Sequence, residues 1–239
     1  MMLYAWVDGV SRPPLSKGER TTCRDCGGLL TSVVPVENVR HWRHKAGDCD
    51  SWSEPEGPWH LGWKEQFDLE CREIGLVDAL TGERHRADVL CGAGTPQATV
   101  LELQHSSISA DEQRSRENFY QQAHRMFWLV HIHSEANFNG YSFGFSLDFG
   151  SRPVVLEGHT YGVMRWMGRS KQFIEKWKRA KAHVFFDYQG HVFYLASESV
   201  SLRLGGPFKK GEFALCVLTH EQFMQAVKQR DFSTLRPNG

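Results

Sequence analysis

Two stretches decide the fold of this chain, Arg86-Ala87-Asp88-Val89-Leu90 and Thr99-Val100-Leu101-Glu102-Leu103-Gln104. Each reads as a short strand, and the Gly- and Pro-containing turn between them predicts a hairpin. Side chains alternate along a strand, so Glu102 and Gln104 share one face, and the hairpin brings Asp88 beside Glu102. Two adjacent carboxylates repel each other unless a cation separates them, which favours a hard divalent metal ion such as Mg²⁺. The alternative is an ordinary amphipathic hairpin with solvated polar residues.

Composition limits the class of protein. The 239 residues, 41% of them hydrophobic, suffice for one large domain or a compact domain with smaller attachments. The 28 basic side chains equal the 28 acidic ones in number, so any nucleic-acid surface must be local. No apolar run reaches membrane-spanning length and the first residues lack a signal-peptide pattern, which predicts a cytoplasmic protein without membrane contact.

Three of the six cysteines lie close together with histidines, which favours a metal site in a reducing compartment. Cys23 and Cys26 form a Cys-x-x-Cys pair followed by two glycines, the pattern of a zinc knuckle. His44 and Cys49 complete a tetrahedral structural Zn²⁺ site, with His41 as the substitute ligand. A degenerate finger that holds no metal is the alternative.

A polar, Pro-containing junction at residues 51–58 separates this zinc-binding module from the next region. Apolar residues at helical spacing predict a helix from Trp59 to Gly75. His60 and Lys64 are four residues apart and share one face of it, with Glu65 beside them.

The hairpin is followed by a crossover. Ser109 and Glu112 form a capping-box pattern that begins a helix ending near His124. The apolar run from Met126 to Ile132 is typical of a central parallel strand covered on both faces. Helix, strand, strand, helix and strand in this order predict an α/β core.

The remaining chain predicts further mixed structure. A strand or irregular hairpin arm is expected within 137–150, and a helix rich in basic residues from Arg165 to Lys181. Arg169, Lys171 and Lys178 of this helix are candidate contacts to a phosphate backbone, although a solvated, charge-rich helix is the alternative. We also expect a hairpin (184–188 and 192–196), a strand (213–218) and a last helix (221–229).

Three domains follow from these observations. Residues 1–52 form an N-terminal zinc-binding module, 53–135 an α/β core, and 136–239 a C-terminal α+β region of uncertain role.

The first 133 residues resemble the competence protein CoiA-like family, whose members resemble nucleases of the PD-(D/E)xK (restriction-endonuclease-like) superfamily. The resemblance depends on an ordered set of short matches rather than on any one of them. The matching residues are Tyr4-Ala5 with Asp8-Gly9, Cys23 and Cys26, His41-Trp42-Arg43-His44, His60 with Lys64, Arg86-Ala87-Asp88-Val89, Glu102-Leu103-Gln104 with Ser106 and Ile108, and Arg116 with Tyr120 before the strand containing Trp128.

The resemblance implies a restriction-endonuclease-like mixed sheet flanked by helices, and a Mg²⁺- or Mn²⁺-dependent deoxyribonuclease. Asp88 and Glu102 are then the ligands of the catalytic metal, and DNA is the substrate. Gln104 departs from the wider superfamily, which usually has lysine at this position, but resembles CoiA-like proteins. An amide orients water without supplying positive charge.

Other residues take their predicted roles from the same comparison. Lys64 is a candidate for the missing cation, His60 for its companion near the scissile phosphate, and Glu65 for an extra metal ligand. The candidate nucleic-acid contacts in the matching region are Arg86, Ser106, Arg116 and Tyr120. Many nucleases of this superfamily pair two active sites, so a homodimer is one arrangement that the resemblance allows.

Two other functions remain open from the sequence. One is a DNA-binding or recombination-assisting protein that keeps the nuclease fold and cleaves poorly. The other is a zinc-stabilised interaction module in a defence or mobile-element system.

Overall fold

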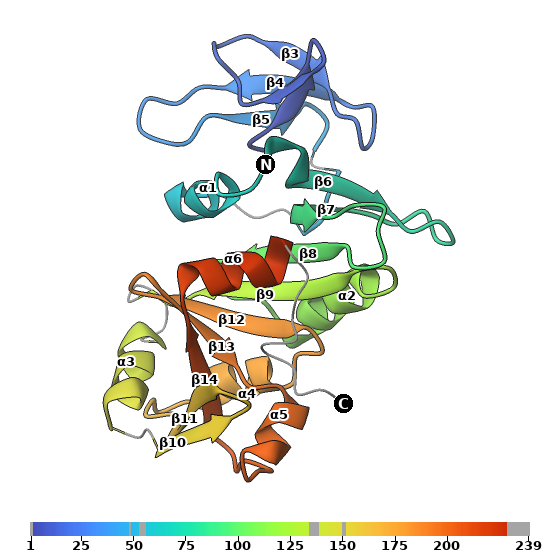
Figure 1. Cartoon of the computed structure of the whole chain (residues 1–239). Helices are drawn as coiled ribbons and strands as arrows, with labels where there is room; N and C mark the ends of the chain where they lie inside the picture. Colours follow the sequence, from blue (N-terminus) through green and yellow to red (C-terminus); the bar gives the residue numbers. More distant parts are fainter. Residues whose placement is uncertain (1, 48, 53–55, 134–138, 150–151, 229–239) are drawn as a thin grey trace. The chain divides into compact units, whose positions relative to one another are not determined.

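A computed structural model describes residues 2–47, 49–52, 56–133, 139–149 and 152–228 (Figure 1). Contacts divide the chain into two compact units, Met1–Ala93 and Gly94–Gly239. Each unit has its own strands and helices, so each is treated by itself below.

The N-terminal unit consists mainly of short antiparallel strands. One pair is β1 with β2, a three-stranded sheet has the order β3-β4-β5, and β6 pairs with β7. The elements are β1 (Ala5–Val7), β2 (Val10–Arg12), β3 (Arg20–Thr22), β4 (Leu29–Val33), β5 (His41–His44), α1 (Pro58–Lys64), a 3-10 turn (Leu69–Cys71), β6 (Arg72–Val77) and β7 (Arg84–Cys91).

The helix predicted from Trp59 to Gly75 is wrong beyond Lys64. Helix α1 ends there, and the chain from Arg72 onward is strand β6 instead. The Arg72 guanidinium donates to the carbonyl oxygens of Glu65 and Phe67, which holds the intervening turn in a non-helical path. The β-ladder with β7 overrides the helical spacing of apolar residues that the sequence shows.

The C-terminal unit is a mixed α/β structure. Its strands and helices are β8 (Thr99–Gln104), α2 (Ala110–Tyr120), β9 (Arg125–His131), α3 (Asn139–Phe149), β10 (Arg152–Leu156), β11 (His159–Arg165), α4 (Gln172–Lys178), β12 (His183–Tyr188), β13 (His191–Leu195), α5 (Glu198–Arg203), β14 (Glu212–Leu218) and α6 (His220–Lys228).

Seven strands of this unit follow one another in the order β10-β11-β14-β13-β12-β9-β8. Strand β9 is parallel to both β8 and β12, whereas the other neighbours are antiparallel. Residues 126–130 of β9 are all buried, as the continuous apolar run predicts for a central strand. The expected mixed α/β class is therefore confirmed.

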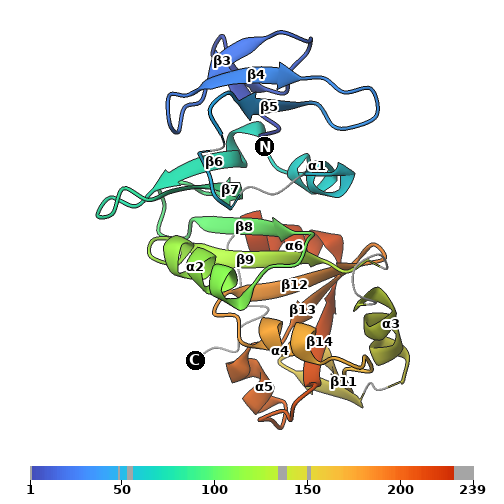
Figure 2. The same cartoon turned by 180° about the vertical axis from the view of Figure 1, so that it is seen from behind.

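Helices cover both faces of this sheet. On one face α4 packs through Trp177 against Trp128, with ring centroids 5.6 Å apart, and α2 lies on the same face (Figure 2). The other face is covered by α6 (Figure 1). Its Phe223 packs against Phe185, with ring centroids 5.0 Å apart. Aromatic contacts thus make up much of the core on each side.

Local signals in the sequence account for several of these elements. The Ser109 hydroxyl accepts a hydrogen bond from the Glu112 amide at 3.0 Å, which caps α2 as predicted. Gln189 and Gly190 have φ values of 51° and 78°, the left-handed conformations of the tight turn expected between β12 and β13. The strand predicted at 213–218 and the last helix are also present; Gln229, the predicted end of that helix, lies outside the described residues.

Two predicted elements are wrong in this unit. The described part of 137–150 is helix α3, not a strand, because the buried residues Gly140, Phe143 and Ser146 recur every three positions. The basic helix predicted from Arg165 to Lys181 is limited to Gln172–Lys178, since Arg165 ends β11.

The three-domain division stays a prediction. Its boundaries, at 52/53 and 135/136, fall at residues outside the described ranges. Strand β12 of the predicted C-terminal region pairs directly with β9 of the predicted core, so these two regions share one sheet. Among the described residues, no helix is both long and apolar enough to span a membrane.

We expect Leu129→Ala to lower the free energy of unfolding by about 2–5 kcal/mol, because Leu129 is 0% exposed in the central strand and its loss leaves a cavity. Leu202→Ala is the matched control, since Leu202 is 52% exposed, and should change stability by no more than about 0.5 kcal/mol. Urea denaturation of both variants measures the difference. Equal stabilities would contradict the assignment of β9 as the core strand.

Candidate functional site

A buried ammonium group lies at the centre of a carboxylate cluster in the N-terminal unit. Lys64, at the end of α1, has a side chain that is 1% exposed. Its Nζ lies 2.6 Å from Glu56 Oε2, 3.0 Å from Glu73 Oε1 and 2.9 Å from Asp88 Oδ1. These four residues are called the Lys64 cluster below.

Strands β6 and β7 bring two of the acids together. Their ladder pairs Arg72 with Val89 and Ile74 with Ala87, so Glu73 and Asp88 lie opposite each other between these pairs. Glu73 has a φ of 51°, a left-handed conformation that a non-glycine residue rarely adopts. Such backbone strain is typical of functional sites, where the surrounding structure holds it in place.

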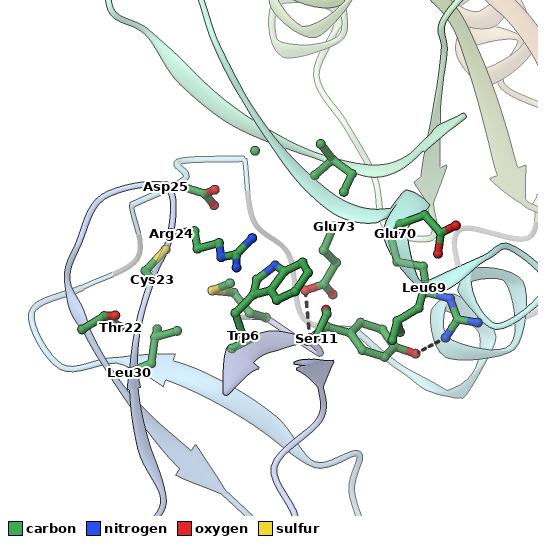
Figure 3. A pocket seen from close by; sticks show the side chains of 16 residues that line it. Trp6, Ser11, Thr22, Cys23, Arg24, Asp25, Leu30, Leu69, Glu70 and Glu73 are labelled. Atoms are coloured by element: carbon green, nitrogen blue, oxygen red, sulfur yellow. Dashed lines mark hydrogen bonds between the residues drawn. The ribbon is translucent and has the colours of Figure 1, made fainter. Parts of the chain in front are cut away.

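Contacts with the N-terminal strand fix the Glu73 carboxylate further. It accepts hydrogen bonds from the backbone amides of Leu3 at 2.9 Å and Tyr4 at 3.1 Å. Glu73 also lines a pocket of about 310 Å³, where Arg24 stacks over the Trp6 ring at 3.5 Å (Figure 3). The cluster therefore lies beside a cavity of the same unit.

The Lys64 cluster carries more negative than positive charge. Three carboxylates surround one ammonium group, and the side chains of Glu56 and Glu73 are only 9% and 3% exposed. Burial, together with the charges of Glu73 and Asp88, outweighs the nearby Lys64 and raises the pKa of Glu56 to about 8. The carboxylates conversely hold the pKa of Lys64 well above its ordinary value.

His60 and Glu65, the other two predicted site residues near Lys64, lie in different surroundings. His60 is 1% exposed, and its Nδ1 accepts a hydrogen bond from the Gly57 amide at 3.3 Å. Glu65 is exposed and forms the C-cap of α1. The acids that surround Lys64 are thus Glu56, Glu73 and Asp88.

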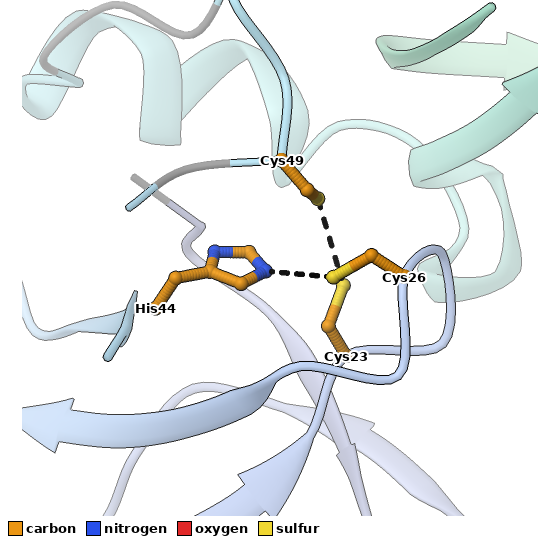
Figure 4. A group of neighbouring side chains, drawn as sticks. All are labelled: Cys23, Cys26, His44 and Cys49. Carbon is orange, nitrogen blue, oxygen red and sulfur yellow. Dashed lines mark hydrogen bonds between the residues drawn. The ribbon is translucent and has the colours of Figure 1, made fainter. Parts of the chain in front are cut away.

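A second cluster unites the four predicted zinc ligands, Cys23, Cys26, His44 and Cys49 (Figure 4). Their ligand atoms all lie within 4.8 Å of one another. Cys23 Sγ is 3.9 Å from Cys49 Sγ, and Cys26 Sγ is 3.5 Å from His44 Nε2. A tetrahedral zinc ion with Zn–S bonds of about 2.3 Å separates two sulfurs by about 3.8 Å, so the four residues can hold a structural Zn²⁺.

Backbone geometry shapes this site. The Gly27 amide donates to the Cys23 carbonyl at 2.8 Å, and the Gly28 amide donates to Cys26 Sγ at 3.3 Å. Gly27 has a φ of 72°, which glycine adopts without strain. His41, the substitute ligand, points its Nδ1 at the Val39 carbonyl instead and is not in the group.

Arg86, a predicted nucleic-acid contact, lies next to the thiols. Its guanidinium forms an ion pair with Asp25 at 2.6 Å and donates to Cys49 Sγ at 3.6 Å and Cys23 Sγ at 3.8 Å. Burial and then the neighbouring Cys23 raise the pKa of Cys49 to about 12, partly offset by Arg86. A bound divalent cation supplies the remaining positive charge that stabilises the thiolates.

The C-terminal unit holds the other predicted catalytic residues on β8. Glu102 is 3% exposed and accepts a hydrogen bond from Arg116 Nη1 at 3.2 Å. Gln104 is 2% exposed and donates to the Ser106 carbonyl at 3.1 Å. Arg116 also pairs with Glu112 at 2.6 Å, and its carboxylate neighbours raise its pKa although burial opposes them.

The remaining predicted DNA contacts differ in exposure. Ser106 and Arg169 are exposed, Lys171 and Lys178 are half-buried, and Tyr120 is 1% exposed. A groove of about 1010 Å³ between α2 and the segment around α4 contains two of them. Six basic side chains line this groove against two acidic ones: Arg114, Arg169, Lys171, Lys176, Arg179 and Lys210, with Glu117 and Glu175.

Asp88 and Glu102 belong to different units of the chain, so their pairing around one metal ion stays a prediction from the sequence. The structure does bring Asp88 and Lys64 into contact. Glu56 and Glu73 were missed because neither belongs to a recognisable motif. In the sequence, Glu56 lies two residues before α1 and Glu73 is the second residue of β6, and neither position distinguishes it from other acidic residues.

No protein-family model matches this chain, and neither the curated proteins nor the solved structures contain a match. The CoiA-like resemblance stays a prediction from the residues quoted for it.

We expect Cys26→Ser to weaken the thiolate site, because it removes one of four ligands. The measurement is the thiolate-to-metal charge-transfer absorption of the Co²⁺-substituted protein, which reports cysteine ligation specifically. The absorption should fall strongly, and the thermal unfolding temperature of the zinc-loaded chain should decrease. Cys71→Ser, outside the group, should leave the absorption unchanged, and an unaltered spectrum in Cys26→Ser would refute the site.

The Lys64 cluster also predicts a pH dependence of stability. The pKa of Glu56 is raised from 4.5 to about 8, so the folded protein binds a proton there that the unfolded chain releases. This contribution is complete below about pH 4.5 and is lost as the pH rises to about 8. Urea denaturation at pH 5, 6.5 and 8, without added Mg²⁺, should therefore show Glu56→Gln gaining stability over wild type by a few kcal/mol as the pH rises.

Glu37→Gln controls for loss of an acid in general, since Glu37 is exposed. Its stability should follow that of wild type at all three pH values. A constant difference between Glu56→Gln and wild type would show that Glu56 is ionised throughout.

Proposed function

We propose that this chain is a metal-dependent nuclease that hydrolyses DNA phosphodiester bonds. The observation that carries the proposal is the Lys64 cluster, in which three carboxylates converge on one buried ammonium group. The order of α1, β6, β7, β8, α2 and β9 along the chain is compatible with the α/β core that the CoiA-like resemblance implies.

The donor type suits a hard divalent cation, although Glu56, Glu73 and Asp88 are not among the described groups whose ligand atoms all lie within 4.8 Å of one another. Mg²⁺ and Mn²⁺ prefer carboxylate oxygens, and the cluster has two more carboxylates than ammonium groups. Asp88 is the most accessible of the three acids, with 21% of its side chain exposed. It is therefore the residue that we assign to the accessible side of the metal.

A bound Mg²⁺ supplies charge neutralisation at a phosphate oxygen and lowers the pKa of a bound water molecule. Asp88 holds the cation in this proposal, and Glu102 is its predicted second ligand. Lys64 fixes the orientation of Asp88 and offsets part of the charge of the cluster. Gln104 is the candidate to orient the attacking water through its amide.

DNA is the proposed substrate because of the basic groove in the C-terminal unit. Its six cationic side chains suit a phosphate backbone, and Arg169 and Lys171 at its edge were predicted as contacts. Glu175 is already neutralised by Lys178, at 2.8 Å, which leaves the groove cationic.

A DNA-binding protein with a weak or inactive nuclease site is the second candidate. Lys64 Nζ contacts three carboxylates, so its ammonium group is committed to the cluster rather than available to a phosphate. The basic groove supports DNA binding whether or not cleavage follows.

The test is cleavage of plasmid and of linear single-stranded DNA by the full chain with Mg²⁺, Mn²⁺ or a chelator. Cleavage should require the metal and fall at least about 100-fold in Asp88→Asn, which keeps the size of the side chain and removes its charge. Lys64→Met should also lower the rate, because Asp88 then loses its positioning partner. Asp148→Asn is the matched control, since Asp148 is exposed on α3.

The outcomes separate the candidates. An electrophoretic shift without metal-dependent cleavage would favour the DNA-binding protein. Full activity in Asp88→Asn would refute the assignment of the Lys64 cluster, and unchanged activity in Lys64→Met would eliminate the role of the lysine.

A further inference from the structure

Three histidines meet at the end of two parallel strands in the C-terminal unit. His105 directly follows β8, and His131 is the last residue of β9. Gln104 pairs with Val130 in the β8–β9 ladder. The residues that follow them, His105 and His131, therefore lie side by side. His133 follows two positions later, beyond the end of β9, and its ring centroid lies 5.0 Å from that of His131.

The ring nitrogens converge. One nitrogen from each ring lies within 4.8 Å of the others, and the Nδ1 atoms of His105 and His131 are 2.8 Å apart. The rings of His105 and His133 stack, with centroids separated by 4.4 Å. Ligands of α/β sheets commonly bind at this carboxyl end of parallel strands.

The hydrogen bonding of His133 leaves one ring nitrogen available to a cation. Its Nε2 lies 3.4 Å from the His105 carbonyl oxygen, so this nitrogen carries the proton and donates it. The proton on Nε2 leaves a lone pair on Nδ1, which is buried and has no hydrogen-bond partner among the described residues. A metal-binding histidine commonly has this arrangement, with one nitrogen bound to a carbonyl and the other directed at the ion.

We propose that His105, His131 and His133 bind a transition-metal ion of the zinc, cobalt and nickel class. Imidazole nitrogen suits these borderline cations, whereas Mg²⁺ prefers the oxygen donors of the Lys64 cluster. The site goes beyond the proposed nuclease function and does not depend on it. Its residues all lie in the C-terminal unit, whereas the four zinc ligands of the knuckle lie in the N-terminal unit.

The rings must adjust to hold an ion, since their ligand nitrogens lie within 4.8 Å of one another. Metal–nitrogen bonds of about 2.0–2.1 Å place tetrahedral ligands about 3.3 Å apart. The observed separation of 2.8 Å between the Nδ1 atoms of His105 and His131 therefore increases by about half an ångström on binding.

Three protein ligands leave one coordination position open, as in catalytic rather than structural sites. A small cavity of about 40 Å³ adjoins the three rings and is also lined by Ser106, Asn139 and Lys176. The Lys176 ammonium, which donates to the Ile108 carbonyl at 2.7 Å, adds positive charge to this cavity. The open position therefore favours water or an anionic oxygen ligand such as phosphate.

The test is calorimetric titration of Ni²⁺ into the untagged, full-length chain. One equivalent of Zn²⁺ first fills the cysteine site, and excess Mg²⁺ occupies carboxylate sites, so the remaining Ni²⁺ binding reports the histidines. Wild type should bind one Ni²⁺ per chain. Each of His105→Gln, His131→Gln and His133→Gln should weaken binding at least about tenfold, because even loss of an outer-shell partner costs about 10–100-fold.

His191→Gln is the matched control, since His191 is exposed on β13, and should bind Ni²⁺ as wild type does. Shifts of the imidazole ¹⁵N resonances on adding a second equivalent of diamagnetic Zn²⁺ give a second readout, and they should be largest at the three residues. Circular dichroism of the metal-free variants identifies those that fold. Absence of Ni²⁺ binding in wild type, or unaltered affinity in any folded variant of the three, would overturn the proposal.

Discussion

A buried ammonium group surrounded by three carboxylates is the constraint on which the N-terminal unit depends. Lys64 lies within 3.0 Å of all three acids and is almost fully removed from solvent. Desolvating these charges is costly, and removing one partner leaves the others uncompensated. Hydrophobic residues would fill the same space with less cost, so a lysine buried among three acids is a candidate for a functional role.

Side-chain contacts join the Cys-x-x-Cys turn to β7, the strand that carries Asp88. Arg86 of β7 pairs with Asp25 of the knuckle and contacts two of its thiols. Gly75 of β6 permits this close approach, because a Cβ there would lie 2.0 Å from Asp25 Oδ1. A metal bound by the cysteines therefore stabilises the position of β7, two residues before Asp88, and not only the small sheets around it.

The buried cluster around the Cys-x-x-Cys turn is small. It contains Met2, Ala5, Cys23, Leu30 and Trp42, of which only Trp42 is large. So few apolar side chains contribute little to the stability of three short strands. A metal held by Cys23, Cys26, His44 and Cys49 would close the loops between these strands and add stability.

The sequence could predict elements whose signals are local. The Ser109 cap, the turn at Gln189 and Gly190, and the apolar run of β9 each depend on neighbouring residues, as does the Cys-x-x-Cys knuckle. Glu56 and Glu73 could not be found in this way, because their relation to Lys64 arises from the approach of α1 to the β6–β7 ladder. For the same reason the spacing of apolar residues after Trp59 predicted too long a helix, since tertiary pairing decides where β6 begins.

The histidine site could not be predicted from the sequence either. His131-Ile132-His133 is a visible pattern at the end of β9, but its chemistry depends on His105, 26 positions earlier than His131. Only the parallel pairing of β8 with β9 brings the rings together. The three donor sets of the chain then differ in hardness: thiolates with one imidazole, carboxylates alone, and imidazoles alone. Ligand softness governs which cation each donor set prefers. Different sites on one chain can therefore suit zinc, magnesium or manganese, and a borderline transition metal.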